Sequence, residues 1–283
     1  MKTKKIIIFF LLLIPLIVMA IYANMPVKQP EMELVSKDIN PDSIDITNPA
    51  YETSNSMDTT NLFPFPTEGI PVLMYHSIST APGNTLCVSE TQFQEEMAWL
   101  ENNNYHTLNM DQLYDALVNG ASVPENPIVI TFDDGYADNY QVAWPILKQY
   151  GFTATFFVIT NYVGTDTIDW NQLKELISQG NSIGSHSVHH LDMITLSNAQ
   201  QESELSQSKQ ILEASLGTSI IAFCFPSGQY YDTTLKILSD TGYKLSFTTR
   251  PGKVYLGNNQ FKLHRVRIDG GMSLSGFISQ VSY

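Results

Sequence analysis

The chain has only two cysteines, Cys87 and Cys224, among its 283 residues. Disulfides therefore cannot hold the fold together, and the chain must bury a hydrophobic core. In an exported protein the two cysteines can pair, and two buried free thiols are the equally good alternative. Nothing in the sequence brings them within bonding distance.

Positive charge is also scarce, with 15 Lys and Arg against 28 Asp and Glu and a net charge of −13. No basic patch is visible, so nucleic acid is not an expected partner. An acidic surface also argues against polyanionic substrates. Neutral or cationic glycans fit it better.

Only one apolar run is long enough to span a membrane, and it covers residues 6–23. Three lysines precede it, as in a signal peptide or an N-terminal membrane anchor. No clean A-x-A cleavage site follows the run, so both alternatives stay open. Because lysines stay inside, either one sends the rest of the chain across the membrane. We therefore expect a secreted protein, or one held at the cell surface by residues 1–25.

Residues 26–66 are rich in Asp, Glu, Ser, Thr, Asn and Pro and show no period of 2 or 3.6. We interpret them as a disordered acidic linker. Residues 67–283 have the size of one α/β barrel domain, and strands alternate with helices along them. We expect a single globular domain and a monomer.

The apolar run 128–132 leads directly into Asp133, Asp134 and Gly135. The run predicts a buried strand, and Gly135 allows a sharp turn just after it. The carboxyl ends of core strands are where α/β proteins usually place their sites. Because adjacent side chains diverge, one acid can bind a metal while the other stays free as a base. The residues alone leave open which acid takes which role.

A second predicted strand, residues 182–185, ends in a cluster of histidines. His186 and His190 are four residues apart, so one helical turn would place both on one face. Together with one carboxylate they make a three-ligand metal site that keeps open positions for water. His189 should point elsewhere. The alternative is a solvated histidine-rich loop.

These two stretches together resemble the first two motifs of the NodB-type polysaccharide deacetylases, carbohydrate esterase family 4. Residues 131–135 resemble the family's T-F-D-D-G motif, and residues 186–190 resemble its H-[S/T]-x-x-H motif. The resemblance covers roughly residues 69–283. It implies a distorted (β/α) barrel and a hydrolase that acts on an acetylated polysaccharide.

The resemblance also implies the roles of the acids and histidines. It makes Asp133 the general base and makes Asp134, His186 and His190 the metal ligands. Such a divalent metal lowers the pKa of its water and polarises the carbonyl. Two histidines and one aspartate suit zinc, and cobalt, nickel or iron also fit such a site.

A strand over residues 72–75 ends at His76. Most family members carry the catalytic histidine in a late L-x-H motif. Some exported members that de-N-acetylate poly-N-acetylglucosamine are circularly permuted and carry it early, as V-x-x-Y-H, and residues 72–76 match that version. We therefore assign the acid role to His76 and keep His264 as the alternative. The permuted order favours poly-N-acetylglucosamine as substrate, followed by peptidoglycan or chitin oligomers.

The chain departs from the family at Cys224, where many members have the arginine of an R-P-P-x-G motif that orients the catalytic aspartate. Permuted members also tend to read x-Y-P-x-G, so the loss need not mean inactivity. Arg265 or Arg267, at another strand end, is a candidate replacement. A backbone N–H near Ser227 is expected to help hold the oxyanion, as the family's corresponding loop does.

Three aromatic residues, Tyr136, Trp170 and Tyr230, offer apolar or stacking surface for a sugar ring. The resemblance implies that Trp170 lines the pocket for the acetyl methyl group and that Asp169 hydrogen-bonds the catalytic histidine or a nearby arginine. The alternative is a capping aspartate beside a packed tryptophan.

A long polar helix is predicted over residues 197–216, with Leu205, Ile211 and Leu212 facing inward. We expect its Glu, Gln and Lys residues to be largely solvated.

Three functions follow from these patterns. The first is a metal-dependent de-N-acetylase that acts on an extracellular N-acetylglucosamine polymer. The second is an O-acetyl esterase that acts on xylan or another acetylated glycan. The third is a surface glycan-binding protein that kept the fold and lost the activity, and the missing arginine is its only support.

Overall fold

The computed structural model describes residues 62–283. The expected signal or anchor segment and most of the expected linker lie outside these residues. Part of the segment 62–66, which we assigned to the linker, contacts the domain instead. Phe63 forms an antiparallel bridge with Val123, and Phe65 is buried in an apolar cluster. The boundary at residue 67 is therefore too late, because Phe65 has apolar surface to bury.

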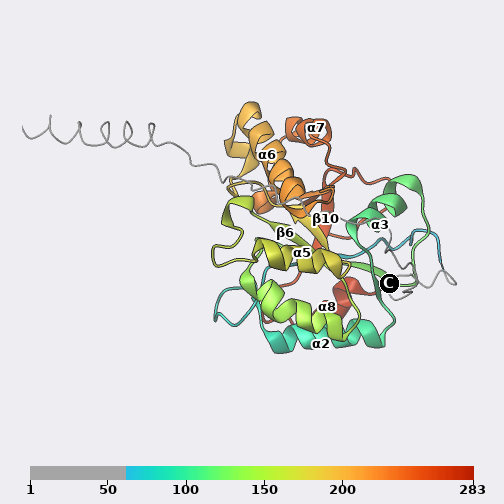
Figure 1. The fold of residues 1–283 in the computed structure, drawn as a ribbon. Helices are drawn as coiled ribbons and strands as arrows, with labels where there is room; N and C mark the ends of the chain where they lie inside the picture. Colours follow the sequence, from blue (N-terminus) through green and yellow to red (C-terminus); the bar gives the residue numbers. More distant parts are fainter. Residues whose placement is uncertain (1–61) are drawn as a thin grey trace, which may run out of the picture. The chain divides into compact units, whose positions relative to one another are not determined.

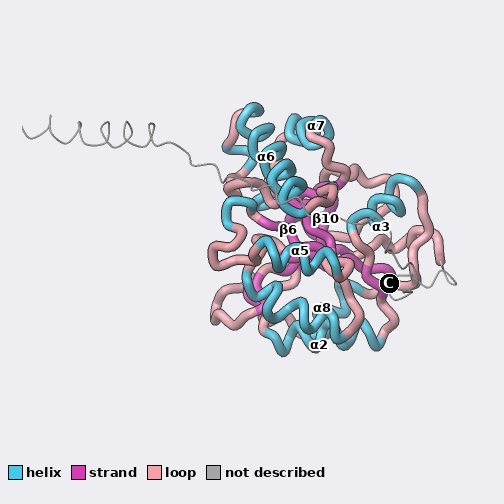
Figure 2. The backbone as a smooth tube through the Cα atoms, viewed as in Figure 1, coloured by secondary structure: helices cyan, strands magenta, loops and turns pink. Residues whose placement is uncertain are grey.

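Seven parallel strands close into a barrel and follow one another around it in chain order. Figure 2 shows the strands grouped in the middle of the domain, with helices around them. Closure comes from β1, which pairs with β5 on one side and with β10 on the other. The strands are β1 (Val72–Tyr75), β5 (Pro127–Phe132), β6 (Thr155–Val158), β7 (Ser182–Ser185), β8 (Ala222–Cys224), β9 (Leu245–Pro251) and β10 (Leu263–Arg267).

Three further strands are short. β4 (His106–Thr107) pairs with the start of β5, and β2 (Ser77–Ile78) pairs with β3 (Cys87–Val88) in a small separate sheet. The predicted barrel of βα units is confirmed.

Helices cover the outside of the barrel (Figure 1). α2 packs against α4 and α8, and α6 packs against α5 and α7. The α-helices are α2 (Glu90–Asn102), α3 (Met110–Tyr114), α4 (Trp144–Gln149), α5 (Trp170–Ser178), α6 (Asn198–Leu216), α7 (Asp232–Asp240) and α8 (Leu274–Val281). Short π- or 3-10 turns are η1 (Asp115–Asn119), η2 (Asn139–Ala143), η3 (Thr160–Tyr162), η4 (Met193–Thr195) and η5 (Pro226–Gly228). Between residues 62 and 283, none of the helices combines the length and apolar character that a membrane crossing needs.

Side chains alternate between the inside of the barrel and the layer beneath the helices, as successive residues of a strand must. On β5, Val129 belongs to the inner apolar cluster, whereas Ile128, Ile130 and Phe132 belong to the outer one. The same alternation carries Asp133, one residue past Phe132, to the inside.

Gly184 on β7 shows how tightly the interior is filled. A Cβ atom at this position would lie 2.3 Å from the ring of Phe157, which points into the barrel from β6. A larger side chain would push β7 away from β6. His186 would move with the strand, because it follows Gly184 by only two residues.

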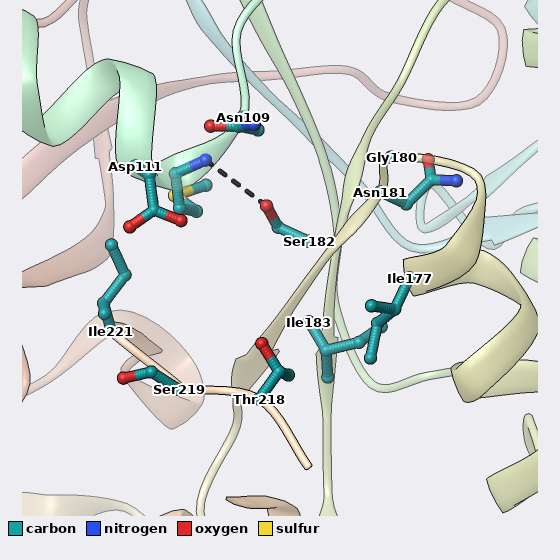
Figure 3. A pocket seen from close by; sticks show the side chains of 11 residues that line it. Asn109, Asp111, Ile177, Gly180, Asn181, Ser182, Ile183, Thr218, Ser219 and Ile221 are labelled. Carbon is teal, nitrogen blue, oxygen red and sulfur yellow. Dashed lines mark hydrogen bonds between the residues drawn. The ribbon is translucent and has the colours of Figure 1, made fainter. Parts of the chain in front are cut away.

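The amino-terminal end of the barrel holds a pocket of about 210 Å³ beside the start of β7 (Figure 3). Met110 closes one side, where its backbone N–H donates to Ser182 Oγ at 3.4 Å. Asp111 is the only ionisable side chain in the pocket lining. The candidate metal ligands lie at the opposite end of the barrel, after the carboxyl ends of the strands.

Candidate active site

The carboxyl ends of the strands bring together side chains that are far apart in the sequence. His76 follows β1, Asp133 and Asp134 follow β5, His186 follows β7, and Arg265 lies on β10. In a parallel barrel all these positions lie at one end, which is why separate strand-end motifs can form a single site.

Asp134, His186 and His190 form a compact triangle of ligand atoms. Asp134 Oδ1 lies 3.3 Å from Nε2 of each histidine, and the two Nε2 atoms are 3.1 Å apart. Ligands about 2.05 Å from a tetrahedral zinc ion are separated by about 3.3 Å. The three atoms therefore fit a divalent metal with at least one further position for water or substrate.

The ring of His186 is held in the tautomer that a metal requires. Its Nδ1 lies 2.8 Å from the carbonyl oxygen of Cys224, and since that oxygen can only accept, Nδ1 carries the proton. The lone pair of Nε2 then faces Asp134 and His190. The side chain is 3% exposed, so the orientation is fixed by packing as well as by the hydrogen bond.

The backbone around the triangle is unusual. Asp134, Ser187 and His190 have φ angles of 71°, 67° and 58°, in the left-handed region that side chains other than glycine rarely adopt. Conformations of this kind cluster at functional sites, where the surrounding structure holds them in place. Here they turn the two loops so that the three ligand atoms converge.

Asp133 is not part of this triangle and forms a buried ion pair with Arg265. The guanidinium makes two parallel bonds, from Nη1 to Oδ1 at 2.8 Å and from Nη2 to Oδ2 at 2.7 Å. Its remaining donors contact Thr131 Oγ1, Cys224 Sγ and the carbonyl of Thr248, at 3.1 Å each. All five guanidinium N–H groups are therefore paired, which allows Arg265 to be fully buried.

A register shift between β9 and β10 accompanies this arrangement. Leu263 pairs with Phe247, but Arg265 pairs with Pro251, so β9 contains extra residues at the level of the ion pair. Bulges of this kind re-aim groups next to active sites. Of the two arginines that the sequence offered, Arg265 contacts Asp133, whereas Arg267 pairs with Asp269 at 2.7 Å.

The two aspartates carry negative charge for different reasons. Burial raises the pKa of Asp133, but the charge and hydrogen bonds of Arg265 lower it by a larger amount. The pKa of Asp133 therefore lies below its usual value. Burial also raises the pKa of Asp134, and the neighbouring His186 and His190 side chains more than reverse that effect. Both groups are therefore ionised at neutral pH.

His76 also lies near Asp133. Its Nε2 is 3.9 Å from Asp133 Oδ2, and its side chain is 13% exposed. Burial lowers the pKa of His76, and the neighbouring carboxylates only partly offset this. Asn139 Nδ2 donates to the backbone oxygen of His76 at 2.7 Å, and Asp138 accepts from the N–H of Ile78 at 2.9 Å. These contacts fix the chain where it leaves β1.

His264, the alternative acid, does not share this environment. It precedes Arg265 on β10, and adjacent strand residues point to opposite faces. Its Nδ1 lies 3.0 Å from where a Cβ on Gly252 would be. The geometry therefore supports His76 over His264.

The predicted sugar-contacting residues and Ser227 lie in different environments. Tyr136 lies beside the site, where burial and the Asp134 carboxylate raise its pKa to about 12. Tyr230 is half-buried and stacks on Phe225, with ring centroids 4.9 Å apart. Ser227 lies in the turn after β8 with a φ angle of 54°. Trp170 is half-buried and packs against the outer apolar cluster.

Asp169 caps helix α5. Its Oδ1 accepts from the backbone N–H groups of Asn171 and Gln172, at 2.8 and 2.9 Å. Among the described residues its side chain makes no hydrogen bond to His76 or to an arginine. The structure therefore agrees with the capping alternative, because the carboxylate is already used at the helix terminus.

The two cysteines are both free. Cys87 is half-buried on β3, whereas Cys224 is buried beside Arg265, with Sγ 3.1 Å from Nη2. The thiol stands where many members of the resembled family have an arginine. Its small size leaves room for the guanidinium that arrives from β10.

Sequence reasoning missed Glu204, which binds the histidine loop from helix α6. We expected the polar residues of this helix to be solvated, but Gln201, Glu204 and Ser208 are buried. Ile211, expected to face inward, is 38% exposed. The missed signal was spacing, because these polar positions lie three and four residues apart on the same face as Leu205.

Comparison with known proteins gives one consistent result. The polysaccharide deacetylase family model matches residues 120–246. YxkH of Bacillus subtilis (strain 168), which is named as a polysaccharide deacetylase, is 40% identical over 209 residues, covering 74% of each chain. The poly-beta-1,6-N-acetyl-D-glucosamine N-deacetylase of Staphylococcus aureus is 28% identical over 196 residues, covering 64% of this chain and 67% of that one.

A solved structure agrees with these relatives. The Streptococcus pyogenes deacetylase PplD, in complex with acetate, superposes with a TM-score of 0.73 at 33% identity. The superposition covers 76% of this chain and 99% of that one.

Proposed function

Because the chain belongs to the polysaccharide deacetylase family, we propose that it is a metal-dependent hydrolase that removes N-acetyl groups from a polysaccharide. One observation carries the proposal. Three ligand atoms lie 3.1–3.3 Å from one another, beside a second carboxylate that is not among them. A hydrolytic metal site needs both parts, a metal with an open position and a free base.

The arrangement of the two aspartates supports distinct roles. Asp134 faces the two histidines and is the proposed third ligand, whereas Asp133 is bound to Arg265. Oδ1 of Asp133 accepts one bond from the guanidinium and keeps a further lone pair, whereas Oδ2 accepts from the guanidinium and, at 3.5 Å, from the Cys224 thiol. Asp133 can therefore accept a proton from the attacking water while Arg265 holds its orientation.

A divalent metal, for which zinc is our first choice, would polarise the acetyl carbonyl and make the water acidic. His76, with Nε2 3.9 Å from Asp133 Oδ2, is the proposed acid that protonates the departing amine. The backbone N–H of Ser227 is the proposed second donor to the oxyanion. Tyr136, Trp170 and Tyr230 are the proposed surfaces for the sugar.

We propose poly-N-acetylglucosamine as the substrate, with peptidoglycan and chitin oligomers next. The named activity of the Staphylococcus aureus relative supports this choice. The acidic composition also suits a polymer that becomes cationic as its amines are freed. The apolar segment at residues 6–23 supports a place outside the cell or at its surface.

The third alternative was a glycan-binding protein without catalytic activity. That reading depended on the arginine missing at position 224, but Arg265 supplies a guanidinium to the same carboxylate. The O-acetyl esterase uses the same site with a different leaving atom, so the test includes its substrate.

The test measures acetate release by the full chain from β-1,6- and β-1,4-linked N-acetylglucosamine oligomers and from acetylated xylan. Metal is first removed and then zinc or cobalt is restored. We expect metal-dependent release from the β-1,6 oligomers, lost in Asp134→Ala and in His76→Ala but kept in His264→Ala. Release from acetylated xylan alone would select the esterase. Tight metal and glycan binding without release from any substrate would contradict the proposal.

A further inference from the structure

Helix α6 carries a buried polar stripe on the face that packs toward the barrel. Gln201, Glu204 and Ser208 are 0%, 8% and 0% exposed, and they alternate on this face with the buried Leu205 and Leu212. Burying three polar side chains is costly unless each one is hydrogen-bonded. Their partners show what the stripe does.

Glu204 binds the residues between the two histidine ligands. Its Oε2 accepts from the backbone N–H groups of Val188 and His189, both at 2.9 Å. Its Oε1 accepts from Nδ1 of His189 at 2.6 Å. His189, which lies between the proposed ligands, is thereby turned away from the metal position.

The other two members of the stripe hold the same segment on either side. Ser208 Oγ lies 2.8 Å from Ser185 Oγ, one residue before His186. Gln201 Nε2 donates to the carbonyls of Met193 and Leu196 at 2.9 and 3.1 Å. The segment that carries His186 and His190 is therefore fixed before, within and after the ligands by one helix.

We propose that Glu204 is a positioning residue that holds the loop in its metal-binding shape. The inference rests on the metal site proposed above. The loop contains two left-handed residues, Ser187 and His190, a conformation that is unfavourable by itself. Without the carboxylate, two backbone N–H groups would lose their partners and the loop would relax. Binding a metal would then require ordering the loop again, which weakens the affinity.

The test measures zinc affinity of the full chain by competition with a chromophoric chelator. The ligand-field absorption of bound cobalt reports the geometry of the site. We expect Glu204→Ala to weaken zinc binding by about 10- to 100-fold, as loss of groups that orient metal ligands does, and to change the cobalt spectrum. Glu204→Gln should weaken binding less than Glu204→Ala, because its one carbonyl oxygen can still accept from both N–H groups.

Two matched controls separate positioning from stability. Glu202→Ala removes an exposed glutamate from the same helix and should leave affinity unchanged. Leu205→Ala removes a fully buried apolar side chain from the same face and should lower thermal stability without changing affinity. Normal zinc affinity in Glu204→Ala, or an equal loss in Leu205→Ala, would overturn the inference.

If Glu204→Ala does not fold, the zinc affinity of Glu204→Gln tests the inference instead. Weaker zinc binding at unchanged stability of the metal-free protein supports the inference, and unchanged binding overturns it. The expected affinity losses without acetate release by wild type would leave Glu204 as a positioning residue and refute the proposed function. A wild-type chain that binds neither metal would refute both.

Discussion

Two buried carboxylates lie on opposite sides of the barrel wall, and their pKa values shift in opposite directions. Asp133 points into the barrel and is 2% exposed, whereas Glu96 reaches the outer side of the wall from α2 and is 1% exposed. Arg265 holds the pKa of Asp133 below its usual value, despite a burial effect that raises it. Burial raises the pKa of Glu96 to about 7, and hydrogen bonds from Tyr75 and Gln92 only partly offset it.

The difference shows what ionises an acid inside this fold. Tyr75 and Gln92 donate good hydrogen bonds to Glu96, at 2.7 and 2.9 Å, but both donors are neutral. Asp133 instead has a bidentate guanidinium. A fixed positive charge offsets the loss of hydration that neutral donors leave uncompensated. The fold therefore keeps Asp133, the proposed base, ionised at neutral pH, whereas Glu96 titrates near pH 7.

The largest expected effect comes from making both acids neutral without changing their shape. Asp133→Asn should lower acetate release by about 10²- to 10⁴-fold, because the proposed base is lost. Glu96→Gln should leave release near the wild-type value, since Glu96 lies behind the wall. The measurement is kcat/KM of the metal-loaded chains on N-acetylglucosamine oligomers. Equal losses in both variants would remove the distinction between the two sites.

Replacing Arg265 should leave Asp133, like Glu96, as a buried carboxylate without a positively charged partner. Arg265→Met leaves a buried carboxylate unpaired and should lower the free energy of unfolding by about 3–5 kcal/mol. Arg267→Met is the matched control, because its pair with Asp269 is partly exposed and contributes about 1 kcal/mol or less. Urea unfolding at neutral pH measures both changes. A similar small loss in the two variants would mean that Asp133 does not need the charge.

Glu96 should make stability fall as pH rises. Its pKa is raised from 4.5 to about 7, so between these values the folded state holds a proton that the unfolded state has lost. The free energy of unfolding of the wild type should therefore fall by up to about 3 kcal/mol between pH 4.5 and a pH above 7, relative to that of Glu96→Gln. Urea unfolding of the two proteins across this range tests the prediction. Parallel pH profiles would show that Glu96 titrates normally.

The smallest effect is expected from Tyr75→Phe. This change removes one neutral donor from Glu96 and keeps the aromatic packing against Phe93 and Phe132. At pH 5, where Glu96 is protonated, the free energy of unfolding should fall by about 1 kcal/mol. Acetate release should not change, although His76 is the next residue. A large loss of release would connect the outer carboxylate to the site.

The barrel could be predicted because its local patterns agree with its tertiary structure. The strand over residues 182–185 and the α6 helix, which begins after Ser197 and ends before Gly217, occur where the sequence placed them. Helix α8 was not anticipated. The domain boundary was misplaced because Phe65 looks like part of a polar linker until its position in the inner cluster is known.

The candidate metal ligands and base could be located from the sequence because each motif is local, and the family resemblance assigned the roles of the two aspartates. Asp133 and Asp134 are adjacent, and His186 and His190 share one short loop. Each motif also ends a predicted strand, and parallel strands end on the same side of a barrel. These two facts bring the groups together without any knowledge of the packing.

Only the tertiary structure decided which groups support that site. Arg265 reaches Asp133 from 132 positions away, beside a register shift on β9, whereas Arg267 pairs with Asp269 and strand alternation turns His264 to the other face. Glu204 meets the histidine loop because α6 packs with a polar stripe inward. The motifs specify the proposed reacting groups through chain neighbours, whereas the charge and orientation of these groups depend on contacts between distant elements.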